Sequence, residues 1–271
     1  MRRNLMKKAI FVFIFAALLV FSFTAAAPAA TSLDGILKKG ELVVGITGTQ
    51  PPLNATNKAG EVIGLDADIA KLIALNMGVK IKFSKMSFSE LLPALEAGKV
   101  DLVISSMTMT LERNLKVAFV GPYYVSGKGI LTKASAIAAL QETDGLNKAE
   151  FKVAALKDST SQKFVETAAP NAELVKVKSY DDALDMLFQD KIKALVADYP
   201  FCAFSAFRHR DKGLVAGQSR LTFEPLGIAV QPDTLLINWL RNFVIMLDGS
   251  GQLKALGQRW FESGDWIKDL P

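Results

Sequence analysis

The 271-residue sequence contains one cysteine and one histidine. Cys202 therefore has no partner for an internal disulfide, and its apolar setting, YPFCAF, is typical of a packed, inert thiol. His209 stands among charges in FRHRDKG, which indicates a solvated helix end. These counts exclude the usual zinc ligand sets and leave a Ser-His-Asp triad only one possible base. We therefore expect no metal site, no cofactor and no catalytic triad.

The N-terminus has the three parts of a secretory signal peptide. MRRNLMKK is basic, residues 9–23 are apolar, and TAAAPAA offers small residues for cleavage. An uncleaved membrane anchor is the alternative, but the apolar run is short for the roughly 20 residues of a membrane span. No cysteine follows for lipid attachment. We expect residues 1–30 to be removed, with cleavage between about Ala26 and Ala30, and the mature protein to be a soluble periplasmic monomer.

The positive charge of the chain is concentrated in this N-terminal segment. The formal net charge is +5, and four of the 32 Lys and Arg residues lie in the first eight positions, which hold no acids. The rest of the chain has 28 basic and 27 acidic residues, with no long basic run. A nucleic-acid partner is therefore not expected, because binding to the phosphate backbone depends on clustered positive charge.

Segments typical of strands and helices alternate along the mature chain, which predicts an α/β fold with right-handed crossovers and mainly parallel sheets. A Gly-rich break, SGKG, separates two such series near residue 127. The expected strands are 41–47, 79–86, 100–104, 117–124, 151–158, 172–179 and 193–199, and the expected helices are 64–78, 88–98, 160–169 and 180–191.

The length and this break favour two domains, the second inserted into the first. We expect lobe 1 to contain residues 31–126 and 225–271, and lobe 2 to contain residues 127–224. The extended stretch LTFEPLGIAVQPD would return the chain to lobe 1, where the C-terminal amphipathic helix, broken by DGSG, would pack. Two α/β domains that face each other across a cleft suit ligand binding by hinge closure.

The stretch SSMTMTLER, residues 105–113, places hydroxyl side chains between the end of a buried strand and an arginine. Thr110 is a suitable N-cap for a short helix, with Glu112 in the first turn. A strand end, backbone N–H groups and the guanidinium of Arg113 would then meet at one point, and a guanidinium matches a carboxylate with paired donors. The alternative is a surface arginine, although the first turn of a helix is a poor place for a cation.

The motifs occur in an order that resembles the periplasmic polar amino-acid binding proteins of ABC importers, an extracellular solute-binding family that includes glutamine, histidine and lysine/arginine/ornithine binders. They are GEVIGLDADIAKLIA, FSELLPALEAGKVDLVISSMTMTLER followed by FVGPYY, VADYP, and EPLGIAV ahead of GQLKALGQRWF. The resemblance covers nearly the whole mature chain. It implies a type II periplasmic-binding-protein fold, in which two α/β domains joined by two hinge strands enclose an L-amino acid for delivery to a membrane permease.

The resemblance also implies roles for individual residues. Arg113 would bind the α-carboxylate of the ligand, and Asp198, at the end of a predicted strand, would bind the α-ammonium. The alternative for Asp198 is a helix N-cap, because Pro200 follows at a suitable position. Ser106 and Thr108 would add hydroxyl and N–H donors. Thr160 and Ser161 would contact the carboxylate, although helix capping alone would explain one hydroxyl there. Phe88 would pack on the aliphatic part of the ligand, and its alternative is an ordinary core aromatic.

Three positions bear on which amino acid is bound. Binders of basic amino acids usually have an acid where this chain has Thr47, and many members have an aromatic where it has Gln50. Without that acid, the cationic side chain of a bound lysine, arginine or histidine would be buried without a partner, which is costly. Lys157 matches a lysine that reaches the ligand in some glutamine binders, although it could be a solvated loop residue. A neutral polar or acidic amino acid is therefore the expected ligand.

Two alternatives to transport follow from the same pattern. Cyclohexadienyl dehydratases, which act on prephenate or arogenate, share this fold, but such an enzyme needs a positioned general acid. Glu166, Glu173 and Glu224 are candidates only because they lie in the second half of the chain. A sensor that hands its ligand-loaded form to a receptor would use the same closed form. Asp66 and Asp68 lie in the first turn of a predicted helix, where acids complement the helix dipole, so we expect both to be structural.

Overall fold

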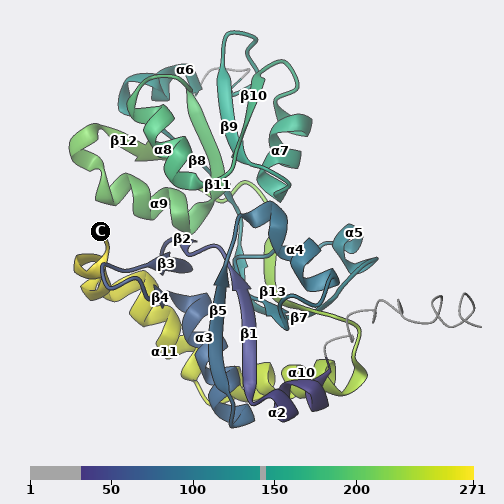
Figure 1. The fold of residues 1–271 in the computed structure, drawn as a ribbon. Coiled ribbons are helices and arrows are strands. Elements are labelled where there is room, and N and C mark those ends of the chain that lie inside the picture. Colours follow the sequence, from purple (N-terminus) through teal and green to yellow (C-terminus); the bar gives the residue numbers. More distant parts are fainter. Residues whose placement is uncertain (1–31, 141–144) are drawn as a thin grey trace, which may run out of the picture. The chain divides into compact units, whose positions relative to one another are not determined.

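The computed structural model describes residues 32–140 and 145–271 (Figure 1), so the expected signal peptide lies outside the described residues. Residues 31–271 form one compact unit. Among the described residues, no helix combines the length and the apolar character needed to cross a membrane. Nor does this part of the chain place three or more His, Cys, Asp or Glu side chains together in a way that could hold a metal ion.

The first five-stranded sheet has the order β5-β1-β6-β13-β7. Strand β1 (Glu41–Ile46) pairs in parallel with β5 (Lys80–Lys85) and with β6 (Leu102–Val103). Strand β13 (Glu224–Val230) is antiparallel to both β6 and β7 (Ala118–Ser126). The C-terminal part of the chain thus returns to complete a sheet that the N-terminal part began.

The second sheet has the order β10-β9-β11-β8-β12. Strand β9 (Lys152–Leu156) is parallel to β10 (Glu173–Val177) and β11 (Ala194–Asp198). Strand β8 (Lys128–Lys133) is antiparallel to β11 and to β12 (Leu214–Ala216). The expectation of mainly parallel sheets is therefore wrong for half of the pairings. The antiparallel pairings all involve β13 in the first sheet and β8 in the second. Strand β7 leads directly into β8, which begins the second sheet.

Helices cover both faces of each sheet. Leu42 and Val44 pack with α3, α10 and α11, whereas the intervening Val43 faces the side of α4, as the alternation of side chains along a strand requires. In the second sheet, Ala155 packs with α7 and Ala154 with α8 and α9. Figure 1 shows α7 on one side of β9 and β10, and α8 on the other. The helices are α2 (Leu33–Lys39), α3 (Leu65–Met77), α4 (Phe88–Glu96), α5 (Leu111–Asn114), α6 (Ile137–Leu140), α7 (Thr160–Ala168), α8 (Tyr180–Phe188), α9 (Tyr199–Arg208), α10 (Thr234–Gly249) and α11 (Gln252–Gln258).

Short elements complete the chain. Strands β2 (Thr49–Gln50), β3 (Asn54–Thr56) and β4 (Val62–Ile63) form a small antiparallel sheet. Helix α3 ends at Gly78, whose left-handed backbone returns N–H groups to the last turn. The short helical turns are Ala134–Ala136, Arg210–Lys212, Arg259–Ser263 and Asp265–Asp269.

The two sheets are connected where β7 passes into β8 and where the chain enters β13. Ser126, the last residue of β7, pairs with Glu224, the first residue of β13. Gly127 follows, and the backbone N–H of Lys128 donates to Thr222 Oγ1 at 3.0 Å. The predicted boundary near residue 127 thus falls between strands of different sheets. The exact division into lobes stays a prediction.

Gly127 is required by a close approach of two chain segments. A Cβ atom there would lie 2.4 Å from the carbonyl oxygen of Thr222 and 2.6 Å from Cβ of Arg220. The backbone of the 220–222 segment would have to move to admit a methyl group.

We expect Gly127→Ala to lower the free energy of unfolding by about 1–3 kcal/mol, the usual cost of overpacking. Urea titration followed by circular dichroism would measure it. Gly249→Ala is the matched control, because a Cβ at Gly249 would meet nothing within 4 Å. If the two variants were equally stable, the crossing would not be as tight as the geometry indicates.

Candidate functional site

Polar side chains from the loop after β6, from β2 and from strands of the second sheet line one small buried cavity. Its free space is about 10 Å³, roughly what one water molecule requires. Seven of the ten predicted site residues are among those that line it. The lining residues are Gln50, Phe88, Ser106, Thr108, Lys128, Leu156, Ser159, Thr160, Ser161, Tyr180 and Asp198.

Asp198 is the last residue of β11 and precedes α9. Asp198 is the N-cap residue of α9, as the alternative predicted, but its carboxylate makes no capping hydrogen bond. Instead, Asp198 Oδ1 accepts a hydrogen bond of 2.8 Å from Nζ of Lys128, the residue directly opposite on β8. The side chain of Lys128 is 2% exposed and that of Asp198 is 8% exposed, so both charges are buried.

Glu224 lies in the same cluster, on β13. Its Oε2 accepts hydrogen bonds from Thr108 Oγ1 at 2.7 Å and from Thr160 Oγ1 at 2.9 Å, and it lies 3.5 Å from Lys128 Nζ. Burial alone would raise the pKa of Glu224, but the Lys128 ammonium and the hydroxyl donors outweigh it, so the pKa lies below its ordinary value. Glu224 is therefore ionised at neutral pH.

Helix α7 begins at this cavity. Ser159 is its N-cap and accepts a hydrogen bond from the N–H of Gln162 at 3.1 Å, so capping is provided by Ser159 rather than by the predicted residues Thr160 and Ser161. Thr160 points its hydroxyl at Glu224. Ser161 Oγ is buried and has no hydrogen-bond partner among the described residues. Of the three hydroxyl groups at this helix end, only that of Ser161 is left available to the cavity.

Arg113 does not line this cavity but a neighbouring pocket that shares Phe88 and Thr160 with it. Its guanidinium donates to the carbonyl oxygens of Thr108 at 2.8 Å and of Asp158 at 3.3 Å, which joins segments of the two sheets. It also stands over the ring of Phe88, 5.5 Å from the centroid. Burial lowers the pKa of Arg113, while the carboxylates of Glu224 and Asp198 oppose that shift.

Helix α5, which carries Arg113, is a single turn. Thr110 is its N-cap as predicted and accepts a hydrogen bond from the N–H of Arg113. A helix of four residues has little dipole, so its contribution to anion binding is smaller than the sequence suggested. Recognition of an anion here would depend on the guanidinium itself.

A buried network positions Ser106, which has a left-handed backbone at φ +52°. Asp66 accepts hydrogen bonds from the N–H of Ser106 at 2.9 Å, from Asn54 Nδ2 at 2.8 Å and from the Tyr123 hydroxyl at 2.8 Å. Burial raises the pKa of Asp66 to about 6. Asp66 is thus more than a dipole-complementing acid, because it holds the strand-end loop in place. Asp68 accepts from Trp260 Nε1 at 2.9 Å, a structural contact.

The three residues predicted to govern ligand preference differ in position. Gln50 lines the cavity, and its buried Oε1 has no hydrogen-bond partner in the described part of the chain. The hydroxyl of Thr47 instead donates to Asn54 Oδ1 at 2.8 Å, and Thr47 does not line the cavity. Lys157 is exposed on the loop before α7 and also lies outside the lining. Roles for Thr47 and Lys157 stay predictions.

Lys128, Tyr180 and the placement of Glu224 were missed by the sequence analysis. Lys128 stands between two glycines in SGKG, immediately after the predicted domain break, and opens a buried strand. A lysine at the start of a buried strand indicates a buried acidic partner, and this signal could have identified Lys128. Glu224 was considered only as an acid of the second half of the chain, whereas in the structure it pairs with Ser126 across the strands and accepts from Thr108 and Thr160 of the cavity lining.

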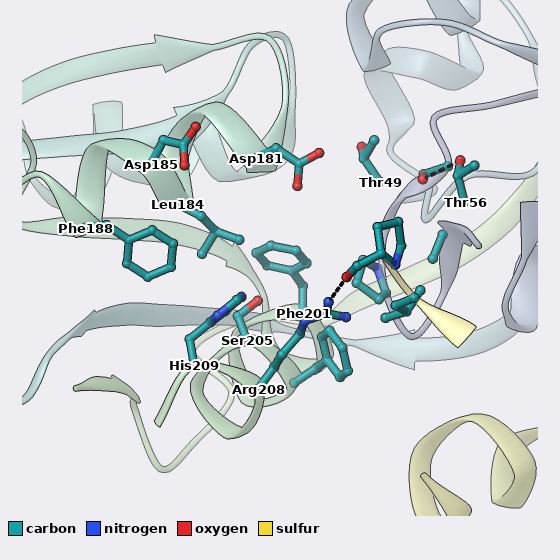
Figure 2. A pocket seen from close by; sticks show the side chains of 16 residues that line it. Thr49, Thr56, Asp181, Leu184, Asp185, Phe188, Phe201, Ser205, Arg208 and His209 are labelled. Atoms are coloured by element: carbon teal, nitrogen blue, oxygen red, sulfur yellow. Dashed lines mark hydrogen bonds between the residues drawn. The ribbon is translucent and has the colours of Figure 1, made fainter. Parts of the chain in front are cut away.

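A second and larger pocket, of about 440 Å³, opens between α8, α9 and the segment of β2 and β3. Figure 2 shows Asp181 and Thr49 on facing sides of it, with Arg208 and His209 below. No predicted site residue lines this pocket. Burial, Lys212 and Arg208 lower the pKa of His209, so its ring is neutral at pH 7.

Cys202 is fully buried on α9. Burial raises the pKa of its thiol far above the ordinary value. This agrees with the prediction of a packed, unreactive side chain.

Comparison with known proteins identifies relatives over most of the chain. The model of the family described as "Bacterial extracellular solute-binding proteins, family 3" matches residues 42–263. The "ABC transporter arginine-binding protein 1" of Escherichia coli (strain K12) is 27% identical over 252 residues, which cover 90% of this chain and 97% of the relative. The "ABC transporter glutamine-binding protein GlnH" of Bacillus subtilis (strain 168) is 28% identical over 208 residues, 75% of this chain and 74% of the relative.

Solved structures show the same fold. The ancestral amino acid-binding protein AncCDT-1, described as a precursor of cyclohexadienyl dehydratase, matches with a TM-score of 0.80 and 33% identity, over 85% of this chain and 99% of that one. A putative binding component of an ABC transporter from Wolinella succinogenes, complexed with lysine, also gives 0.80, with 32% identity over the same shares. The predicted type II two-lobed fold is confirmed.

The raised pKa of Asp66 predicts a pH dependence of stability. Between about pH 4 and 6 the folded chain holds a proton on Asp66 that the unfolded chain has lost, so the stability contributed by this group falls as the pH rises through about 6. The shift of about two units corresponds to about 3 kcal/mol. The difference in unfolding free energy between wild type and Asp66→Asn should therefore shrink by up to that amount from pH 4 to pH 7, as measured by urea titration.

A constant offset between the two proteins would report only the hydrogen bonds that the asparagine loses. A difference that did not change with pH would contradict the assigned pKa of Asp66. Asp68→Asn serves as the control on the same helix turn.

Proposed function

Because the chain belongs to the bacterial extracellular solute-binding proteins of family 3, we propose that it binds an L-amino acid between its two sheets and delivers it to the permease of an ABC importer. One observation carries this proposal: Asp198 lines a buried polar cavity, and the Arg113 guanidinium, which interacts electrostatically with Asp198, stands over Phe88 of the same lining. Gln50 Oε1 and Ser161 Oγ, both without hydrogen-bond partners among the described residues, belong to residues that line that cavity. Opposite charges and unused polar groups suit a zwitterion.

In this proposal Arg113 binds the α-carboxylate and Asp198 binds the α-ammonium. Thr108, Thr160 and Ser161 add donors to the carboxylate, with the N-terminus of the nine-residue helix α7 behind them. Ser106, whose N–H and hydroxyl both donate to Asp66, lines the same cavity. Closure follows from the higher affinity of the ligand for the form in which both sheets contact it.

A neutral polar or acidic side chain fits the lining best. Gln50 and Phe88 offer an amide and an aromatic face, and neither is charged. The acid that the sequence analysis did not place in the site, Glu224, is already paired with Lys128. A basic ligand side chain would thus find no unpaired acid among the residues that line the cavity.

Binding rather than dehydration is supported by the positions of the candidate acids. Glu173 and Glu166 are exposed, and they pair with Lys152 and Lys176 away from the cavity. Glu224 contacts Thr108 and Thr160 of the cavity lining, but its pKa is lowered, and an ionised carboxylate is a poor general acid. We infer that the protein does not turn over prephenate or arogenate.

The family places such proteins outside the cytoplasm, and we infer export through the predicted signal peptide. The mature chain would then meet its ligand in the periplasm as a monomer. Handing the ligand to a receptor instead of a permease would use the same site.

A thermal-shift screen tests the ligand class. The mature protein, refolded from denaturant to remove carried ligand, would be screened against the twenty L-amino acids and prephenate. We expect a shift with one or a few neutral polar or acidic amino acids. A ligand at 100 times its dissociation constant adds about 2.7 kcal/mol of stability. A shift only with arginine or lysine would overturn the ligand class, and turnover of prephenate would overturn the binding role.

Substitution of the charged pair tests the roles of its members. Arg113→Ala and Asp198→Ala should each weaken amino-acid binding by at least about 30-fold, because loss of a buried charged partner costs 2–5 kcal/mol. Isothermal titration calorimetry with the amino acid found in the screen measures this. Arg241→Ala, on the exposed side of α10, is the control. Wild-type affinity in either site variant would show that the assigned pair is wrong.

A further inference from the structure

The groups proposed to bind an amino acid already have partners that resemble one. Asp198, assigned to the ligand ammonium, accepts a hydrogen bond from the Lys128 ammonium at 2.8 Å. Thr108 and Thr160, assigned to the ligand carboxylate, both donate to the Glu224 carboxylate, at 2.7 and 2.9 Å. Within this chain, one ammonium and one carboxylate therefore occupy the positions expected for the two charged groups of the ligand.

We propose that Lys128 and Glu224 form an internal competitor, which occupies the ammonium and carboxylate subsites and changes partners when an amino acid binds. This inference rests on the proposed function and deepens it. It makes Lys128 and Glu224 residues that set affinity, beyond the residues that touch the ligand.

Burial makes these contacts compulsory. Lys128 is 2% exposed and Glu224 is 7% exposed, and they come from β8 and β13, one in each sheet. An unpaired charge at this depth is strongly unfavourable. An arriving ligand must therefore replace each contact that it breaks.

The geometry supplies the replacement. Lys128 Nζ lies 3.5 Å from Glu224 Oε2, so the two can pair with each other once the ligand has taken Asp198 and the threonines. Thr222 continues to donate to Glu224 Oε1, at 3.0 Å. The four charged groups of Arg113, Lys128, Asp198 and Glu224 sum to zero, and a zwitterion leaves that sum unchanged. Lys128, Asp198 and Glu224 thus keep a charged partner before and after the exchange, and Arg113, which now donates to two carbonyl oxygens, gains the ligand carboxylate.

The exchange predicts discrimination among ligands. A carboxylic acid without an α-ammonium can approach Arg113, but it cannot replace Lys128 on Asp198. It would add a negative charge to a balanced cluster. The internal competitor therefore selects zwitterions over simple organic anions.

A double-mutant cycle tests the proposal, with the amino acid from the screen as ligand and calorimetry at pH 7. Lys128→Met alone leaves Glu224 buried without its cation beside the ligand carboxylate. Glu224→Gln alone leaves Lys128 without a partner after displacement from Asp198. Each single variant should bind at least 10-fold more weakly than wild type. The double variant removes the competitor and should bind at least 10-fold more tightly than wild type.

Weaker binding by each single variant together with tighter binding by the double variant distinguishes exchange from a merely structural role. In a structural role, the double variant would bind no better than wild type. That result would overturn the inference while the proposed function stood. If wild type bound none of the twenty amino acids, the proposed function would fail, and this inference with it.

Two controls keep the cycle interpretable. Lys133 and Asp190 form an ion pair of 2.7 Å away from the cavity, and Lys133→Met with Asp190→Asn should leave affinity unchanged. If the double variant at the site does not fold, Lys128→Gln with Glu224→Gln preserves polarity and repeats the measurement. In either version, the ligand-free double variant should melt at a lower temperature than wild type and show a larger shift with ligand.

Discussion

One buried ammonium that lies between two carboxylates is the contact on which the centre of this molecule depends. Lys128 reaches Asp198 within the second sheet and Glu224 at the start of the strand that returns to the first. Because ions at this depth must be paired, the three strands that carry them cannot shift independently. Thr108 and Thr160, which line the cavity, donate to Glu224 of this cluster, and Arg113 in turn donates to the carbonyl oxygen of Thr108.

Local chemistry made much of the fold and half of the site predictable. Gly78 ends its helix in the left-handed conformation, and Thr110 caps the next short helix, as residues of those types do. Asp198 and the hydroxyl run before Arg113 were recognised because each follows a buried apolar strand. The carboxyl ends of such strands meet at one edge of a sheet, where ligands bind in open α/β folds.

The rest depended on contacts distant in sequence. The hydrogen bond from Lys128 to Asp198 spans 70 positions, and that from Thr108 to Glu224 spans 116. No local pattern states which strands are antiparallel, and an antiparallel β8 is what places Lys128 opposite Asp198. Likewise, the helix position of Asp66 suggested a dipole effect, whereas its burial against Ser106 became visible only with the loop folded over it.

The glycine at the crossing between the sheets has an evolutionary consequence. Gly127 admits no side chain because Thr222 passes so close, and its neighbour in sequence is Lys128, whose backbone is bonded to that same threonine. The connection between the two sheets and the buried cation are thus adjacent residues on one short path. A substitution or insertion that reshapes this connection would also displace Lys128. The geometry of the crossing and the charge cluster therefore cannot vary separately.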